Sequence, residues 1–248
     1  MDISQFIENS LSDFPGRTSS VIFTPACNYS CPACYAKRVI SNKSEIKEEE
    51  IFSYIESRKK WIEGVVICGG EPTLQKDLRE FIKKIKERGF YTKLDTNGSN
   101  PEVLEMLLSD GYVDYLAMDV KGPKHLYSNI IGKKEDLAKL EKSMRLASKF
   151  PDYEFRTTIS PIIRINGSKG FYWEFLSLDE AEEMAKWIAE TTESSSKHYL
   201  QQFFSKSKDK MMDERLSKEM IGEQETPRIL IDNIHAKIIK YLPNSKIR

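Results

Sequence analysis

Three cysteines, Cys27, Cys31 and Cys34, lie in one short run of the chain and could together hold a metal cluster. A four-iron cluster bound by protein thiolates alone normally uses four cysteines. A loop that supplies three therefore leaves one iron without a protein ligand, and that iron could bind a substrate or cofactor, as an open catalytic metal site does. The triplet predicts a [4Fe-4S] cluster with one open iron, held on a loop that Pro32 stiffens.

A zinc site is the alternative, because Cys68 could complete a four-thiolate set with the triplet. Structural zinc sites usually combine two pairs of closely spaced cysteines, however, and Cys68 stands alone at the end of the apolar run Val65-Val66-Ile67. We therefore expect Cys68 to be a small core residue. Four cysteines in 248 residues, without a secretory leader, indicate a reducing compartment and no disulfide framework.

Three further polar turns follow predicted strands. The first is Gly69-Gly70-Glu71-Pro72, in which the glycines allow a close backbone approach and Glu71 could accept hydrogen bonds from an ammonium group. The others contain Asp95-Thr96 and Asp119-Val120-Lys121. Each turn could also have a purely structural role. The first could be a strand-to-helix turn with a solvated glutamate, the second an Asx turn at Asp95, and the third a surface ion pair between Asp119 and Lys121.

Strand-like and helix-like patterns alternate along the chain, which predicts an α/β fold built as a partial (β/α)6 barrel of the TIM type. The predicted strands are 21–23, 65–68, 90–94, 115–120, 154–159 and 199–204, and the predicted helices are 45–60, 78–89, 101–108, 135–149 and 179–191. In such barrels the chemistry gathers at the carboxyl ends of the strands. We therefore expect the cysteine loop and the three polar turns to form one site.

The predicted domain order is an amino-terminal lead over 1–18, the barrel over 19–205, and a helical extension over 206–248 that packs on the barrel. Met212, Leu216 and Met220 recur at helical spacing, so we expect an amphipathic helix within 206–225. The histidines, His125, His198 and His235, have no spacing typical of a metal site, and we assign them no role.

The balance of charged residues indicates which kinds of binding partner the sequence favours. Lys plus Arg and Asp plus Glu both total 38, which gives no net charge that would favour nucleic acid or a membrane surface. No apolar run approaches the length of a membrane span, and no secretory leader is evident at the first residues. The expectation is a cytoplasmic protein without nucleic-acid or membrane partners.

The Cys-x-x-x-Cys-x-x-Cys loop followed by Gly-Gly-Glu-Pro resembles the radical S-adenosylmethionine (SAM) enzymes. The resemblance implies that the open iron chelates the amino and carboxylate groups of SAM. One-electron reduction of the cluster would then cleave SAM to methionine and a 5′-deoxyadenosyl radical, which abstracts hydrogen from a substrate. The implied activity is that of an oxidoreductase with no catalytic residues separate from the cluster and SAM, since the chemistry belongs to the cofactors.

Within this superfamily, the sequence resembles the activating enzymes of glycyl-radical proteins, and the nearest type is the activase of anaerobic ribonucleoside-triphosphate reductase. The motifs that carry this resemblance are Asp95-Thr96, Asp119-Val120-Lys121 and the lead Asp13-Phe14-Pro15-Gly16. That group places SAM, and in some members a monovalent cation, at matching positions. The resemblance implies that Asp95, Thr96, the backbone near Ala117 and Asp119 could ligate a cation, and that Lys121 reaches SAM. The implied cofactor-binding residues are Tyr35, Gly69, Gly70, Glu71, Asp95, Thr96, Asp119 and Lys121.

The chain departs from that group at two places. Ala33 stands where a bulky residue usually precedes the third cysteine, and Tyr35-Ala36 stands where many members have His-Asn. Tyr35 could stack on adenine. The sequence has no second set of cysteines for extra clusters, so we expect a separate electron donor, a flavodoxin or ferredoxin. The expected function is to install a glycyl radical on the reductase; the alternatives are small-molecule radical chemistry, like that of deazaguanine synthases, and an iron–sulfur module without SAM turnover.

Overall fold

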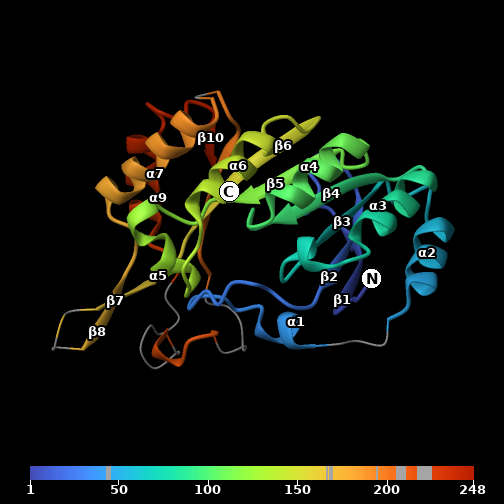
Figure 1. Ribbon diagram of the computed structural model, residues 1–248, viewed down its shortest axis with the longest axis horizontal. Coiled ribbons are helices and arrows are strands. Elements are labelled where there is room, and N and C mark those ends of the chain that lie inside the picture. The colour runs from blue at the N-terminus through green and yellow to red at the C-terminus, as the bar shows by residue number, and fades with distance from the viewer. Residues whose placement is uncertain (43–45, 166, 168–169, 194, 205–210, 217–224) are drawn as a thin grey trace. The chain divides into compact units, whose positions relative to one another are not determined.

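The computed structural model describes residues 1–42, 46–165, 167, 170–193, 195–204, 211–216 and 225–248 (Figure 1). The chain divides into two compact units. Unit 1 comprises Met1–Asn28, Arg38–Met118 and Leu146–Tyr153, and unit 2 comprises Tyr29–Lys37, Asp119–Arg145 and Glu154–Arg248. The cysteine loop is therefore shared, with Cys27 in unit 1 and Cys31 and Cys34 in unit 2. The two units are described separately.

Unit 1 is built on a sheet in which β1 is antiparallel to β2, and β2, β3, β4 and β5 follow in parallel. The strands are β1 (Gln5–Ser10), β2 (Ser19–Thr24), β3 (Gly64–Gly69), β4 (Tyr91–Thr96) and β5 (Tyr115–Asp119). The helices are α1 (Lys37–Ser41), α2 (Glu48–Ser57), α3 (Leu78–Glu87) and α4 (Pro101–Asp110). Figure 1 shows α2, α3 and α4 along one side of these strands.

The two faces of the unit 1 sheet differ in chemistry. Strand register pairs Val66 with Lys93, and Lys93 with Tyr115, so these side chains share one face. Tyr115 and Val66 belong there to a buried cluster with Phe14, Val21 and Ala117. The opposite face carries a row of fully buried aliphatic side chains, which are Ile22, Ile67, Leu94 and Leu116. A charged lysine thus lies beside a buried apolar cluster on this face.

Unit 2 contains three parallel strands in the order β6, β9, β10. These are β6 (Asp152–Ile159), β9 (His198–Gln202) and β10 (Ser245–Ile247), and a separate antiparallel hairpin joins β7 (Ile162–Ile165) to β8 (Phe171–Glu174). The helices are α5 (Tyr127–Ile131), α6 (Leu137–Ala147), α7 (Leu178–Thr191) and α9 (Arg228–Ile238). A capping box between Ser177 and Glu180 fixes the start of α7.

The α/β fold class with parallel strands is confirmed, and each predicted strand and helix of the barrel has a counterpart in the structure. The structure adds β1 within the expected lead, α5, the β7–β8 hairpin, and β10 beyond α9 in the expected helical extension. Of the helix predicted within 206–225, residues 206–210 and 217–224 lie outside the described part, and Glu214–Leu216 form a 3-10 turn. Among the described helices, none combines the length and apolarity needed to cross a lipid bilayer.

Candidate functional site

The glycine turn after β3 packs against the chain that leads into the cysteine loop. The amide of Gly70 donates to the carbonyl of Thr24 at 2.9 Å, and that of Glu71 donates to the carbonyl of Ala26 at 2.8 Å. A Cβ on Gly70 would lie 1.8 Å from the Ala26 oxygen, so only glycine fits there. Ala26 is the one described non-glycine residue with positive φ, at 61°, and it directly precedes Cys27. The predicted glycine turn thus fixes the backbone where the cysteine loop begins.

The Glu71 carboxylate is fully buried and joins two of the predicted turns within unit 1. Its Oε1 accepts hydrogen bonds from the Thr73 hydroxyl at 2.6 Å, the Thr73 amide at 3.1 Å and the Thr96 hydroxyl at 2.7 Å. Its Oε2 accepts one from the Asn97 amide at 2.7 Å. Burial raises the pKa of Glu71, and these donors act against that rise. The structure therefore brings Glu71 and Thr96 into contact, with the carboxylate already engaged by protein donors.

Asn97 joins the turn after β4 to the first cysteine. Its Nδ2 lies 3.9 Å from the Cys27 sulfur and donates to Asn28 Oδ1 at 2.9 Å. The Asn28 side chain in turn donates to the Ser99 hydroxyl at 2.7 Å. Sequence reasoning did not assign Asn97 to the site, although the Asn97-Gly98 pair marks a turn at the end of a strand. An amide near a cysteine sulfur is an interaction that tunes an iron–sulfur cluster.

Asp95 has a partner that the sequence analysis did not identify. The Lys93 ammonium, on the same strand, is hydrogen-bonded to Asp95 Oδ1. Lys93 is 2% exposed and Asp95 18% exposed. Because side chains alternate along a strand, Lys93 and Asp95 lie on one face of β4 and Thr96 on the other. The predicted residues Asp95 and Thr96 therefore have different surroundings within unit 1.

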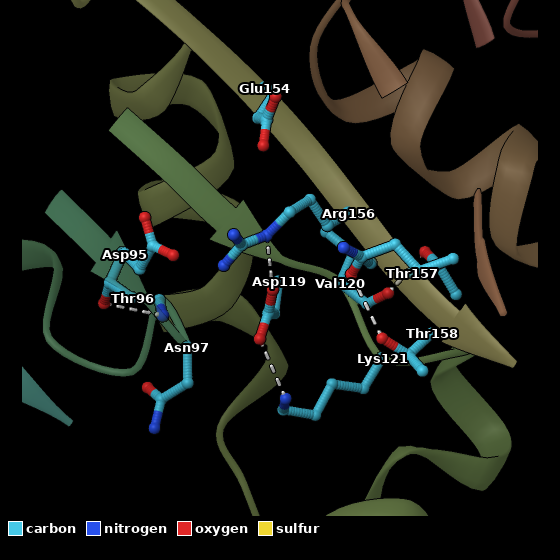
Figure 2. Close-up of polar contacts among 12 residues, drawn as sticks. Asp95, Thr96, Asn97, Asp119, Val120, Lys121, Glu154, Arg156, Thr157 and Thr158 are labelled. Atoms are coloured by element: carbon cyan, nitrogen blue, oxygen red, sulfur yellow. Dashed lines mark hydrogen bonds and ion pairs between the residues drawn. The ribbon is translucent and has the colours of Figure 1, made fainter. Parts of the chain in front are cut away.

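In unit 2, Asp119 lies between two cations, as Figure 2 shows. Its Oδ1 is 3.0 Å from Arg156 Nε and its Oδ2 is 3.1 Å from Lys121 Nζ. Removal from water would raise the pKa of Asp119, but Lys121 and Arg156 outweigh that effect and lower the pKa to about 2. The same removal from water opposes the Lys121 charge, which Asp119 nevertheless stabilises, so the pKa of Lys121 is raised. The predicted pair Asp119 and Lys121 is present, and Arg156 is an addition.

The later part of the cysteine loop is held by backbone hydrogen bonds within unit 2. The amide of Cys34 donates to the carbonyl of Cys31 at 3.0 Å, which closes a tight turn. The carbonyl of Cys34 accepts from Met212 at 2.9 Å, and that of Pro32 accepts from Asp213 at 3.1 Å. These bonds hold the loop to residues that lie far along the sequence, beyond β9.

The two departures from the activase pattern also lie in this unit. Ala33 packs against a buried cluster that includes Ile163, Phe203 and Leu216. Tyr35 is 55% exposed, and its ring centroid lies 6.5 Å from that of Phe203. Ala33 is therefore partly covered by apolar side chains, and Tyr35 is more than half exposed.

A cavity of about 610 Å³ adjoins this part of the loop inside unit 2. Its lining includes Ser30 and Pro32 of the cysteine loop, Gly132 after α5, Ile165 of β7, and Arg215. Both apolar and polar groups line it. The cavity therefore lies directly beside the residues between the first and third cysteines.

All four cysteines are among the described residues, and none forms a disulfide. Cys68 packs against the buried cluster of unit 1. No group of three or more His, Cys, Asp or Glu side chains within the described part of the chain is gathered to hold a metal ion. Cys27 and the pair Cys31 and Cys34 belong to separate units, however. Three thiols lie on one hydrogen-bonded loop, and the Asn97 amide lies beside the first of them. This set of donors fits an iron–sulfur cluster held by thiolates.

These features define an α/β protein whose thiol and charged groups lie on loops at the carboxyl ends of parallel strands. The radical SAM superfamily matches residues 21–165, which is more than half of the chain. The chain belongs to the radical SAM superfamily. Membership implies the use of SAM and an iron–sulfur cluster.

Two relatives in Methanocaldococcus jannaschii each bear the name "putative glycyl-radical enzyme activating enzyme". One is 40% identical over 136 residues, covering 54% of this chain and 56% of the relative. The other is 30% identical over 174 residues, covering 68% of this chain and 62% of the relative. The matches thus span little more than half of these relatives' own length.

A solved structure gives the same fold. Streptococcus suis SuiB bound to S-adenosylmethionine matches with a TM-score of 0.60 at 12% identity, covering 90% of this chain and 48% of SuiB. Because the two sequences are only 12% identical, the similarity shows a shared fold and not a shared function. It agrees with the partial barrel expected for the superfamily.

Proposed function

We propose that this chain is an activating enzyme that installs a glycyl radical in a partner protein, an anaerobic ribonucleoside-triphosphate reductase. The observation that carries the proposal is the three-cysteine loop, held by the glycine turn and Asn97 in unit 1 and by residues beyond β9 in unit 2. The names of the two archaeal relatives support the activase type. When bound, a [4Fe-4S] cluster and SAM would supply a 5′-deoxyadenosyl radical after transfer of one electron from a flavodoxin or ferredoxin.

The chain's own residues would hold and orient these groups. Cys27, Cys31 and Cys34 would ligate three irons and leave the fourth for the amino and carboxylate groups of SAM. Asp119, Lys121 and Arg156 carry one negative and two positive charges, so the cluster of side chains is net positive and suits a carboxylate. The exposed ring of Tyr35 offers a surface on which adenine could stack.

The partner would bring its glycine to the loop as an extended segment. The cavity beside Ser30 and Pro32 is large enough for several residues of peptide and is lined partly by exposed Ile165. The hydrogen atom on the glycine Cα would pass to the 5′ carbon, which gives 5′-deoxyadenosine and the glycyl radical. Methionine would be the third product, so one SAM, one electron and one glycine hydrogen atom account for all the atoms and electrons.

The first test is reductive cleavage of SAM. Anaerobic reconstitution should give about four irons per chain, and dithionite with SAM should release 5′-deoxyadenosine. Replacing Cys27, Cys31 or Cys34 by Ala should abolish that release, while Cys68→Ala should largely retain it. No release from a fully loaded cluster would refute the enzyme proposal and leave an iron–sulfur module; loss of bound metal in Cys68→Ala would restore the four-thiolate zinc alternative.

The second test identifies the substrate. Electron paramagnetic resonance of the reduced enzyme, SAM and the reductase should show a glycyl doublet. Release of 5′-deoxyadenosine without that doublet would contradict the choice of partner and favour a small-molecule substrate instead. The Cys31→Ala variant in the same mixture is the matched control and should give neither signal.

A further inference from the structure

Lys93 places a positive charge where the family resemblance expects a metal cation. The lysine is almost completely buried on β4, and its ammonium is hydrogen-bonded to the Asp95 carboxylate two residues later. The same ammonium lies 5.8 Å from the centroid of the Tyr115 ring. A carboxylate on one side and an aromatic ring on the other are both groups that stabilise a cation.

The surroundings of this ion pair confine the ammonium. Val66 and Tyr115 flank Lys93 in register on the neighbouring strands, and Ala117 flanks Asp95. Val66, Tyr115 and Ala117 belong to one buried apolar cluster. Charged side chains are rarely buried unless they are paired. The Asp95 carboxylate is therefore the counter-ion of the buried Lys93 ammonium inside unit 1.

A potassium or sodium ion at Asp95 would have to share or replace this partner. Sharing puts two positive charges on one carboxylate, and replacement leaves a buried ammonium without its counter-ion. Both arrangements are worse than the pair that the chain already contains. Carboxylate oxygens are suitable ligands for a hard metal cation. At the end of β4, however, the Lys93 ammonium already binds the Asp95 carboxylate.

We propose that the Lys93 ammonium is the permanent cation at the end of β4, so that this chain requires no monovalent metal ion at Asp95. The inference deepens the proposed function, because it concerns the residues expected beside SAM. Lys93 is a positioning residue in this scheme: it neutralises Asp95 and fixes the orientation of that carboxylate. It stands against the expectation, drawn from the family resemblance, that Asp95 could ligate a monovalent cation.

The test measures the thermal midpoint of the apo-protein in KCl, NaCl and choline chloride at equal ionic strength. The wild type should have the same midpoint in all three salts. Lys93→Met keeps the length of the side chain but exposes Asp95 to solvent cations, so its midpoint should rise by about 2 to 4 °C in KCl or NaCl relative to choline chloride. Lys93→Met combined with Asp95→Asn should lose that rise.

Lys86→Met is the matched control. Lys86 also pairs with a carboxylate in unit 1, Asp114, at 2.7 Å, but both side chains are about one quarter exposed. The thermal midpoint of Lys86→Met should be the same in all three salts. Lys93→Arg retains a cation and should behave as the wild type does, which keeps the test informative if Lys93→Met folds poorly.

A wild-type midpoint that rises in KCl or NaCl would overturn the proposal, as would a folded Lys93→Met protein with no response to either cation. Because the apo-protein carries no cluster and no SAM, this outcome is independent of SAM cleavage. Failure of the proposed function would instead appear as absent 5′-deoxyadenosine release with the salt results unchanged.

Discussion

Glu71 shows how a single residue of a functional motif can serve the scaffold. Its carboxylate accepts four hydrogen bonds from three residues and is removed from solvent. Thr96, one of those donors, lies on the face of β4 opposite to Asp95. The carboxylate therefore joins the glycine turn to the turn after β4.

Glu71→Gln should lower the free energy of unfolding by about 1 to 3 kcal/mol. Either orientation of the new amide places an NH2 group against at least one of the donors that now bond to the carboxylate, and a buried donor is left unsatisfied. Urea unfolding of the apo-protein measures the change. Glu102→Gln, on the exposed surface of α4, is the control and should be close to neutral. Equal stability of the two variants would contradict the scaffold role.

Asn97 offers a second test at the scale of the residue. Its amide lies beside the Cys27 sulfur, and a donor near a thiolate stabilises the more negative, reduced state of a cluster. Asn97→Leu should make the reconstituted cluster harder to reduce and slow 5′-deoxyadenosine release about 10-fold. Redox titration followed by electron paramagnetic resonance measures the potential.

Asn100→Leu is the control for Asn97. Asn100 lies in the same loop but donates to the Thr73 hydroxyl at 2.8 Å rather than approaching a cysteine. Its reduction potential should match that of the wild type. If Asn97→Leu and Asn100→Leu had the same potential, the contact with Cys27 would have no electronic role.

At the scale of elements, the β7–β8 hairpin is the part of unit 2 that departs most from a plain β/α repeat. Ile165, Phe171 and Tyr172 are exposed on it, and Ile165 lines the cavity beside the cysteine loop. The Arg215 guanidinium lies 5.5 Å from the centroid of the Phe171 ring. The hairpin thus offers apolar surface next to the place where a substrate segment would enter.

Ile165→Asp should reduce the yield of glycyl radical on the partner about 10-fold or more while leaving 5′-deoxyadenosine release without partner unchanged. The new carboxylate puts an unpaired charge in a contact that we expect to be apolar, and such a contact is worth on the order of 1 to 2 kcal/mol or more. Ile229→Asp is the control, because Ile229 is 68% exposed on α9 and does not line the cavity. Equal effects of the two variants would contradict a role for the hairpin.

Local signals explain which elements the sequence could predict. Leu78, Phe81, Ile82 and Ile85 recur at helical spacing, and all four are buried on α3. The hairpin was missed although its sequence carries a signal, since Asn166-Gly167 stands between two runs rich in β-branched and aromatic residues. β10 has only three residues and a lysine at its centre, so no pattern in it distinguishes a strand from a loop.

For the whole molecule, the contacts that matter join residues far apart in the sequence. The sequence predicted the three cysteines, the glycine turn and the pair Asp119 and Lys121 from local motifs. It did not predict that Arg156 would pair with Asp119, because no local spacing relates two strands that are 37 residues apart. Nor did it predict that Lys93 would be buried, since a lysine within a strand is normally solvated.

His198 connects the last strand of the chain to one of the predicted turns through a series of hydrogen bonds within unit 2. The Thr157 hydroxyl donates to the carbonyl of Val120 at 2.6 Å, and Figure 2 labels both residues. The same hydroxyl lies 3.1 Å from His198 Nε2. Because that hydroxyl has a single proton, Nε2 must donate to it, and Nδ1 then accepts from the Ser245 hydroxyl at 3.0 Å. The neutral ring therefore supports Val120, which lies between Asp119 and Lys121.

This arrangement makes the stability of the protein sensitive to acid. Complete burial, reinforced by the nearby His235 on α9, lowers the pKa of His198 to about 3, below the value near 6.5 that it has in the unfolded chain. Between these values the unfolded chain binds a proton that the folded protein does not, so stability falls as the pH falls below 6.5, by at most about 1.4 kcal/mol per pH unit.

His198→Gln should be less stable at pH 7 but should lose less stability between pH 7 and pH 5, as measured by urea unfolding of the apo-protein. His125→Gln, at an exposed histidine, is the matched control for loss of a histidine. A wild-type slope that His198→Gln leaves unchanged would show that other groups control the acid response.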